Sequence, residues 1–151
     1  MKRIVLVRHA KPESGASSSN PPLSEEGAGT HKRVTEALKS QGIEPTKILS
    51  SPLQRAVQTA AIMAKEFGID VQEYEILDGS HGAEEIVKEI QWIQDGECVF
   101  LVGHVPVMTD LANQLGSEKV AEGVNKSGCV IFDFVTDIDF GKGQYVGYIH
   151  P

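Results

Sequence analysis

Four consecutive apolar residues, Ile4 to Val7, are followed directly by Arg8 and His9. An unbroken apolar run without polar alternation predicts a strand buried on both faces, as in the parallel sheets of α/β proteins. Ligand sites in such open sheets lie at the carboxyl edge of the strands, where Arg8 and His9 stand. Arginine is a permanent planar cation suited to phosphate, and histidine can act as nucleophile, acid–base group or metal ligand. The segment therefore predicts chemistry on an anionic group.

A second apolar stretch, ending at Leu49, also leads into the start of a helix. Ser51 is expected to be the N-cap of this helix, with Pro52 at the first helical position and Gln54 completing a capping-box spacing. Arg55 then falls in or next to the first helical turn. This arrangement predicts a second cation near the carboxyl edge of the sheet.

A third strand pattern, residues 99–102, is followed by Gly103, His104 and a helix start with Pro106. His104 is therefore expected at the turn between strand and helix. Right-handed crossovers between parallel strands place all three strand ends on one edge of the sheet. The residues expected to meet in one pocket at that edge are Arg8, His9, Arg55 and His104.

Strand and helix patterns alternate along the chain, which favours an α/β three-layer sandwich with a mostly parallel central sheet and helices on both faces. The expected strands are residues 3–7, 47–49, 71–74, 98–102, 129–135 and 144–149. The expected helices are residues 24–42, 53–67, 86–93 and 107–115. The last strand follows its predecessor across the short turn at residues 141–143, so this C-terminal strand must be antiparallel to it. A Ser-rich loop is expected at residues 14–20, and a single domain over residues 1–151.

The net charge of −7 argues against a general nucleic-acid or anionic-membrane partner, because either would require a basic surface. No segment approaches the ~20 apolar residues needed to span a bilayer, and the apolar run after Met1 is too short for a signal peptide. The chain is therefore expected to be cytoplasmic. Cys98 and Cys129 lie at or within apolar stretches and are expected to be buried free thiols.

A metal centre is the main alternative use of His9 and His104. Metal sites usually combine several histidine or carboxylate ligands at regular spacing, whereas here two arginines accompany the histidines. Arginine repels a cation and attracts phosphate, so no metal and no cofactor are expected. The remaining histidines receive no role: His31 is surface or core, His81 is a solvated loop residue, and His150 lies near the C-terminus.

Four segments together resemble the histidine phosphatase superfamily, which includes the cofactor-dependent phosphoglycerate mutases. They are residues 7–10 (VRHA), 22–27 (PLSEEG), 51–59 (SPLQRAVQT) and 102–106 (VGHVP). The short length makes the chain most similar to the SixA-type phosphohistidine phosphatases. The resemblance implies that His9 is the phosphorylated nucleophile and that Arg8, Arg55 and His104 hold the phosphoryl group. In the expected mechanism the adjacent phosphate protonates His104.

The resemblance also implies an acidic residue after the third strand, which protonates the leaving group. Asp78 is the candidate in this chain, Glu13 is the second choice, and an enzyme without such an acid is the third possibility. The expected activity is hydrolysis of a phosphomonoester or a protein phosphohistidine through a covalent phosphohistidine. Two alternatives stay open: a phosphoglycerate mutase-like phosphotransferase, and a non-catalytic phosphate- or phosphopeptide-binding module. The expected partner is a phosphorylated small molecule or a phosphohistidine protein.

Overall fold

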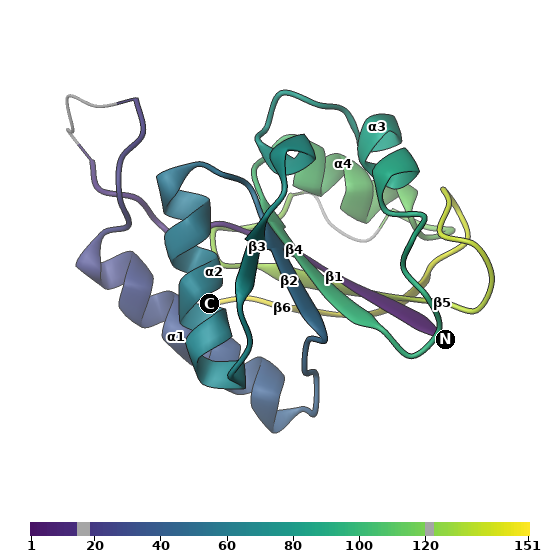
Figure 1. Ribbon diagram of the computed structural model, residues 1–151, viewed down its shortest axis with the longest axis horizontal. Helices are drawn as coiled ribbons and strands as arrows, with labels where there is room; N and C mark the ends of the chain where they lie inside the picture. Colours follow the sequence, from purple (N-terminus) through teal and green to yellow (C-terminus); the bar gives the residue numbers. More distant parts are fainter. Residues whose placement is uncertain (15–18, 120–122) are drawn as a thin grey trace.

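The computed structural model describes residues 1–14, 19–119 and 123–151 of the chain. Their sheet has six strands in the order β3-β2-β4-β1-β5-β6 (Figure 1). The strands are β1 (Lys2–Arg8), β2 (Lys47–Ser50), β3 (Val71–Glu73), β4 (Cys98–Gly103), β5 (Cys129–Phe134) and β6 (Gln144–Ile149). The helices are α1 (Glu25–Ser40), α2 (Gln54–Phe67), the 3-10 helix η1 (Glu75–Leu77), α3 (Ala83–Glu89) and α4 (Val107–Gln114). None of the described helices is both long enough and apolar enough to cross a membrane.

The sheet is mostly parallel, as the sequence predicts. Strands β3, β2, β4 and β1 run in the same direction, and β1 lies between β4 and β5. The reversal occurs at β5, which is antiparallel to β1 and to β6. The expected antiparallel pairing of the last two strands is therefore confirmed, and β5 is the strand that runs against the rest of the sheet.

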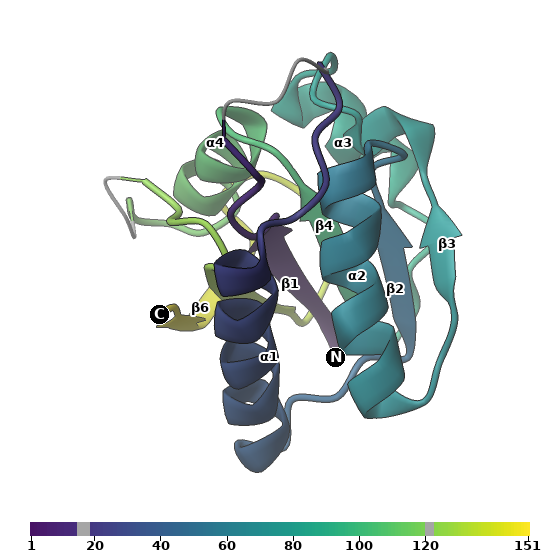
Figure 2. The ribbon, with the colours of Figure 1, turned by 90° about the vertical axis from the view of Figure 1, so that its left-hand side faces the viewer.

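The helices form a layer on each face of the sheet, with α1 and α2 on one side and α3 and α4 on the other (Figures 1 and 2). The residues of β1 alternate between two cores. Ile4 and Leu6 pack in the core under α3 and α4, whereas Val5 and Val7 pack in the core under α1 and α2. All four side chains have no exposed surface. This double burial explains why the run is apolar without alternation.

Helix α1 begins as the sequence predicts. The Ser24 hydroxyl accepts a hydrogen bond from the Gly27 amide at 2.9 Å, which is the side-chain cap of this helix. Gly27 also lies against the segment after β1, because a Cβ at this position would stand 2.2 Å from the carbonyl oxygen of Lys11. A larger residue at position 27 would therefore force α1 away from the segment that follows His9.

Two helix predictions were wrong in their boundaries. Helix α2 begins at Gln54, so Ser51 is not its N-cap and Pro52 does not lie in the helix. The first amide of the helix, that of Gln54, donates instead to Asn20 Oδ1 at 2.9 Å, which places the cap 34 residues earlier in the chain. Helix α3 ends at Glu89 rather than near residue 93.

The apolar residues that led to the prediction of a longer α3 are buried even though they lie outside the helix. Ile90 and Ile93 are at most 1% exposed and pack in the core from a turn. A helix and a turn can both bury residues three apart, so the apolar pattern does not distinguish them.

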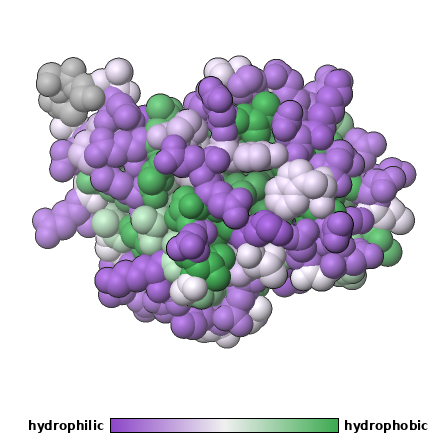
Figure 3. All heavy atoms as spheres, in the orientation of Figure 1, coloured by the Kyte–Doolittle hydropathy of each residue, from purple (hydrophilic) through white to green (hydrophobic). Residues whose placement is uncertain are grey.

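Polar side chains cover most of the face drawn in Figure 3, with smaller apolar areas among them. Cys129 is buried and Cys98 is partly exposed, and both are free thiols. Burial raises the pKa of Cys98 to about 11. The Ser-rich loop lies mainly outside the described residues, since the structure does not describe residues 15–18.

Candidate active site

Three parallel strands end at the same level of the sheet. Arg8 pairs with Gly103 at the ends of β1 and β4, and Ser50 of β2 pairs with Val102. The pairing extends one residue further, since the amide of His9 donates to the Gly103 carbonyl at 3.1 Å. This shared level brings the polar residues after each strand to one edge, as expected for α/β sheets.

His9 follows β1 and is only 7% exposed. Its Nδ1 lies 2.7 Å from the carbonyl oxygen of Ala10. A carbonyl oxygen can only accept, so Nδ1 carries the proton and Nε2 keeps its lone pair. Burial is the main cause that lowers the His9 pKa from 6.5 to about 4. The ring is therefore neutral at neutral pH, with a free nucleophilic nitrogen.

Thr59 holds the backbone next to His9. Its hydroxyl accepts from the Ala10 amide at 2.9 Å and donates to the Arg55 carbonyl at 2.7 Å. One side chain on α2 thereby joins the segment after β1 to the helix turn that carries Arg55. The sequence pattern did not predict this role, because Ala10 and Thr59 are separated by 49 residues.

Three cations lie close enough to His9 to lower its pKa: Arg55, Arg8 and Lys126. Arg55 is the second residue of α2 and also lowers the pKa of His104. Arg8 donates from Nη1 to the Val124 carbonyl at 2.9 Å. Its Nε is buried and has no hydrogen-bond partner among the described residues. The local charge is thus positive on a protein whose net charge is −7.

His104 follows β4 and is 5% exposed. The centroid of its ring lies 5.1 Å from that of His9. Its pKa is lowered from 6.5 to about 4, first by burial and then by electrostatic interactions with His9 and Arg55. Its Nε2 lies 2.7 Å from the Ser51 hydroxyl. The structure therefore brings together the four residues that the sequence placed in one pocket.

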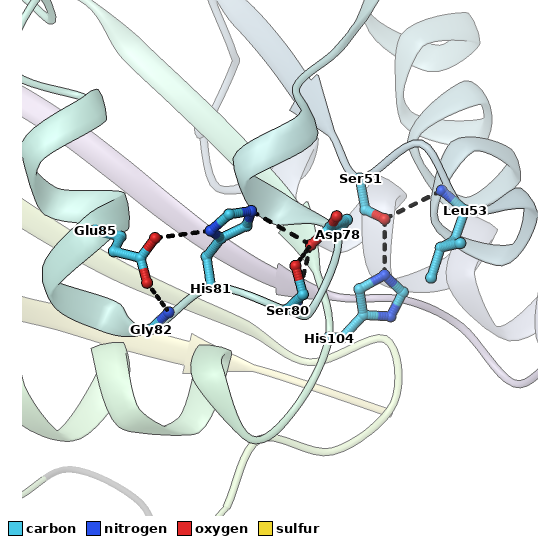
Figure 4. Close-up of polar contacts among 8 residues, drawn as sticks. All are labelled: Ser51, Leu53, Asp78, Ser80, His81, Gly82, Glu85 and His104. Atoms are coloured by element: carbon cyan, nitrogen blue, oxygen red, sulfur yellow. Dashed lines mark hydrogen bonds and ion pairs between the residues drawn. The ribbon is translucent and has the colours of Figure 1, made fainter.

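Asp78 follows η1 and lies between His81 and His104 (Figure 4). Its Oδ1 accepts from the Ser80 amide at 2.8 Å and from the Ser80 hydroxyl at 2.6 Å. These hydrogen bonds lower the pKa of Asp78, because they stabilise the carboxylate. Asp78 is therefore ionised before substrate binds, and its charge raises the pKa of nearby His104.

His81 is not simply a solvated loop residue. Its Nδ1 lies 2.7 Å from Glu85 Oε2 and its Nε2 lies 3.9 Å from Asp78 Oδ1 (Figure 4). The hydrogen bond with Glu85 is the main cause that raises the pKa of His81. Glu13, the second candidate acid, is exposed, and its amide donates to the Pro22 carbonyl at 2.9 Å.

The segment before β5 completes the site from the other side. The amide of Ser127 lies 3.1 Å from the Arg8 carbonyl and 3.3 Å from the His9 carbonyl. Lys126 is exposed and immediately precedes this attachment point. The Ser127 hydroxyl lies 3.0 Å from Nδ1 of His31, a residue of α1 with no exposed surface. Sequence spacing could not predict these contacts, because they join residues that are 96 or more positions apart.

No group of three or more histidine, cysteine or acidic side chains that could hold a metal occurs among the described residues. The donors that converge on His9 are instead two guanidinium groups, an ammonium group and a second imidazole. Such a set matches the oxygen atoms of a phosphoryl group in charge and hydrogen bonding.

Comparison with known proteins agrees with this chemistry. The sequence profile of the histidine phosphatase superfamily (branch 1) matches residues 4–83, which include most of β1, all of α2 and the loop of Asp78. The chain belongs to the histidine phosphatase superfamily. His9, Arg8 and Arg55 lie within the matched part, and His104 lies beyond it.

Two solved structures share the fold of this superfamily member over nearly its whole length. The protein histidine phosphatase SixA complexed with tungstate has a TM-score of 0.84 at 19% identity, over 98% of this chain and 96% of that chain. A mycobacterial glucosyl-3-phosphoglycerate phosphatase has a TM-score of 0.72 at 18% identity, over 99% of each chain. At such identities the likeness shows the fold alone.

A curated relative is more similar in sequence but matches over a shorter region. The 2,3-bisphosphoglycerate-dependent phosphoglycerate mutase of Corynebacterium diphtheriae is 30% identical over 98 residues. The match covers 54% of this chain and 40% of the mutase. The match therefore leaves more than half of the mutase without a counterpart.

Proposed function

We propose that this protein is a phosphatase that transfers a phosphoryl group to His9 Nε2 and then to water. The observation that carries the proposal is the pairing of His9 Nδ1 with the Ala10 carbonyl at 2.7 Å. This contact leaves Nε2 unprotonated beside Arg8 and Arg55 in a buried, positively charged site. A neutral imidazole with a fixed tautomer is a competent nucleophile, and the cations attract its phosphorylated substrate.

In the first step, the Nε2 lone pair forms a bond to phosphorus while the bond from phosphorus to the leaving group breaks. The leaving group keeps the bonding electrons and takes up a proton. Arg8, Arg55 and His104 bind the non-bridging oxygens and stabilise the charge of the transition state. In the second step, water attacks phosphorus, the P–Nε2 bond breaks, and inorganic phosphate leaves. His9 regains its starting form.

Asp78 is the proposed proton donor to the leaving group. Its hydrogen bonds with Ser80 favour the carboxylate in the free protein, which opposes this role. A phosphoryl dianion bound beside His104 would raise the Asp78 pKa by like-charge repulsion and allow the carboxyl group to carry a proton. Glu13 is the weaker candidate, because its side chain is exposed and, within the described part of the chain, its charge does not shift the pKa of His9 or His104. A phosphohistidine substrate needs such an acid less, since its leaving group is better than an alkoxide.

The donors around His9 also support metal independence, because guanidinium groups supply the positive charge that a metal would otherwise provide. The likeness to a mutase favours phosphotransfer to a second substrate as the alternative reaction. The match covers only 40% of that mutase, so most of the mutase has no counterpart in this chain. Here β3 ends at Glu73 and α3 begins at Ala83, with only η1 between them. The short connection supports transfer to water instead.

The same short connection bears on the substrate. With so short a connection after β3, the described part of the chain offers a small phosphate ester few groups to bind beyond its phosphate. A phosphate attached to a protein could reach His9 across an open rim and make further contacts outside it. We therefore place a protein phosphohistidine first among the substrates, ahead of a small phosphorylated metabolite.

Trapping of the intermediate tests the proposal. Brief incubation with a phosphorylated substrate followed by mass spectrometry should find an acid-labile phosphate on His9. The His9→Ala variant should fold normally and lose turnover. Binding of phosphate without turnover in the wild-type protein would support a non-catalytic binding module. Full activity of His9→Ala would exclude His9 as the nucleophile.

A further inference from the structure

Ser51 lies between β2 and α2, and its side chain has no exposed surface. Its hydroxyl oxygen accepts a hydrogen bond from the Leu53 amide at 3.1 Å. The same oxygen lies 2.7 Å from Nε2 of His104 (Figure 4). The hydroxyl group therefore makes two contacts, one to backbone and one to a histidine of the candidate active site.

The single hydroxyl proton of Ser51 decides which group donates in the hydrogen bond between Ser51 and His104. A serine hydroxyl has one proton to donate and two lone pairs. The Leu53 amide uses one lone pair, and the proton still needs an acceptor. Within the described parts of the chain, the acceptor in contact with this buried hydroxyl is His104 Nε2. Donation from Ser51 to Nε2 satisfies both groups, so the ring proton of a neutral His104 resides on Nδ1.

The Nδ1 atom of His104 is buried and has no hydrogen-bond partner among the described residues. In Figure 4 this atom points away from Ser51. The centroid of the His104 ring lies 5.1 Å from the centroid of the His9 ring. A buried N–H group without a partner is uncommon and calls for an explanation. An anion bound beside His9 would provide the missing acceptor.

We propose that Ser51 is a positioning residue that holds His104 as the neutral tautomer with its proton on Nδ1, ready to donate to a phosphoryl oxygen. His104 thus acts as a fixed hydrogen-bond donor without first becoming an imidazolium ion. Donors oriented before the reaction stabilise developing charge without reorganisation. The identity of the anion rests on the proposed phosphatase function, whereas the tautomer is a property of the free protein.

Nitrogen-15 NMR of the histidine rings near pH 7 tests the tautomer without turnover. In the wild-type protein, His104 Nδ1 should show the shift of a protonated ring nitrogen and Nε2 that of an unprotonated one. The Ser51→Ala variant should lose this preference, with protonated Nε2 now populated. The matched control is Ser50→Ala, which removes a neighbouring buried hydroxyl that donates to the Ser51 carbonyl at 2.8 Å. Its His104 signals should match those of the wild type.

Titration with orthovanadate, a phosphoryl analogue, gives the second readout. Ser51→Ala should bind vanadate about tenfold more weakly than wild type and Ser50→Ala, the size of one hydrogen bond. A wild-type His104 with its proton on Nε2 would overturn the proposal, and so would an unchanged tautomer in Ser51→Ala. If Ser51→Ala does not fold, the nitrogen-15 spectrum of the wild-type protein alone tests the tautomer of His104. Absence of wild-type vanadate binding would contradict the phosphatase function but leave the Ser51–His104 assignment to the spectra.

Discussion

His31 should make the protein sensitive to acid. This residue of α1 has no exposed surface, and burial lowers its pKa from 6.5 to about 4. Between pH 4 and pH 6.5 the imidazole of His31 is therefore mostly protonated in the unfolded chain and mostly neutral in the folded protein. Stability must fall as the pH falls through this window. For this single group the loss of folding free energy between pH 7.5 and pH 4.5 is on the order of 2–3 kcal/mol.

The test compares urea unfolding of the wild type and of His31→Gln at both pH values. Glutamine does not titrate and can still form a hydrogen bond with Ser127, the partner of His31 at 3.0 Å. On acidification the variant should lose less stability than the wild type, by on the order of 2–3 kcal/mol. His150→Gln is the control, since it removes an exposed imidazole. Equal acid sensitivity of wild type and His31→Gln would refute the argument.

Three further predictions concern the site. Asp78→Asn should lower kcat for alkyl phosphates by ~10²–10⁴-fold and lower kcat for aryl phosphates much less, because only the poorer leaving group needs a proton. Equal losses of kcat on both kinds of substrate would show that Asp78 has a structural role instead. Lys126→Ala should raise KM about twofold to fivefold for substrates with a second negative charge, because an exposed cation contributes only a modest attraction. Lys88→Ala on α3 should leave KM unchanged. Activity should persist after exhaustive chelation with EDTA and be inhibited by vanadate; recovery that depends on a divalent cation would contradict the metal-free mechanism.

The sequence alone predicted the α/β sandwich and the residues that gather at the carboxyl edge of its sheet. Both predictions rest on local information. A strand buried on both faces needs an unbroken apolar run, and polar groups directly after such a run must lie at its end. Arg8, His9 and His104 follow their strands in this way, so their meeting required only that β1 and β4 be parallel neighbours.

Only the tertiary structure decided what each polar side chain does at that edge. Ser51 has the sequence context of an N-cap, yet its hydroxyl contacts His104, 53 residues away. Asn20 caps α2 in its place, and Ser127 attaches Lys126 beside His9. A short polar side chain can satisfy its hydrogen bonds locally or with any donor or acceptor that the fold brings within reach. Sequence spacing describes the local choice, whereas the packing of distant segments determines which partner is present.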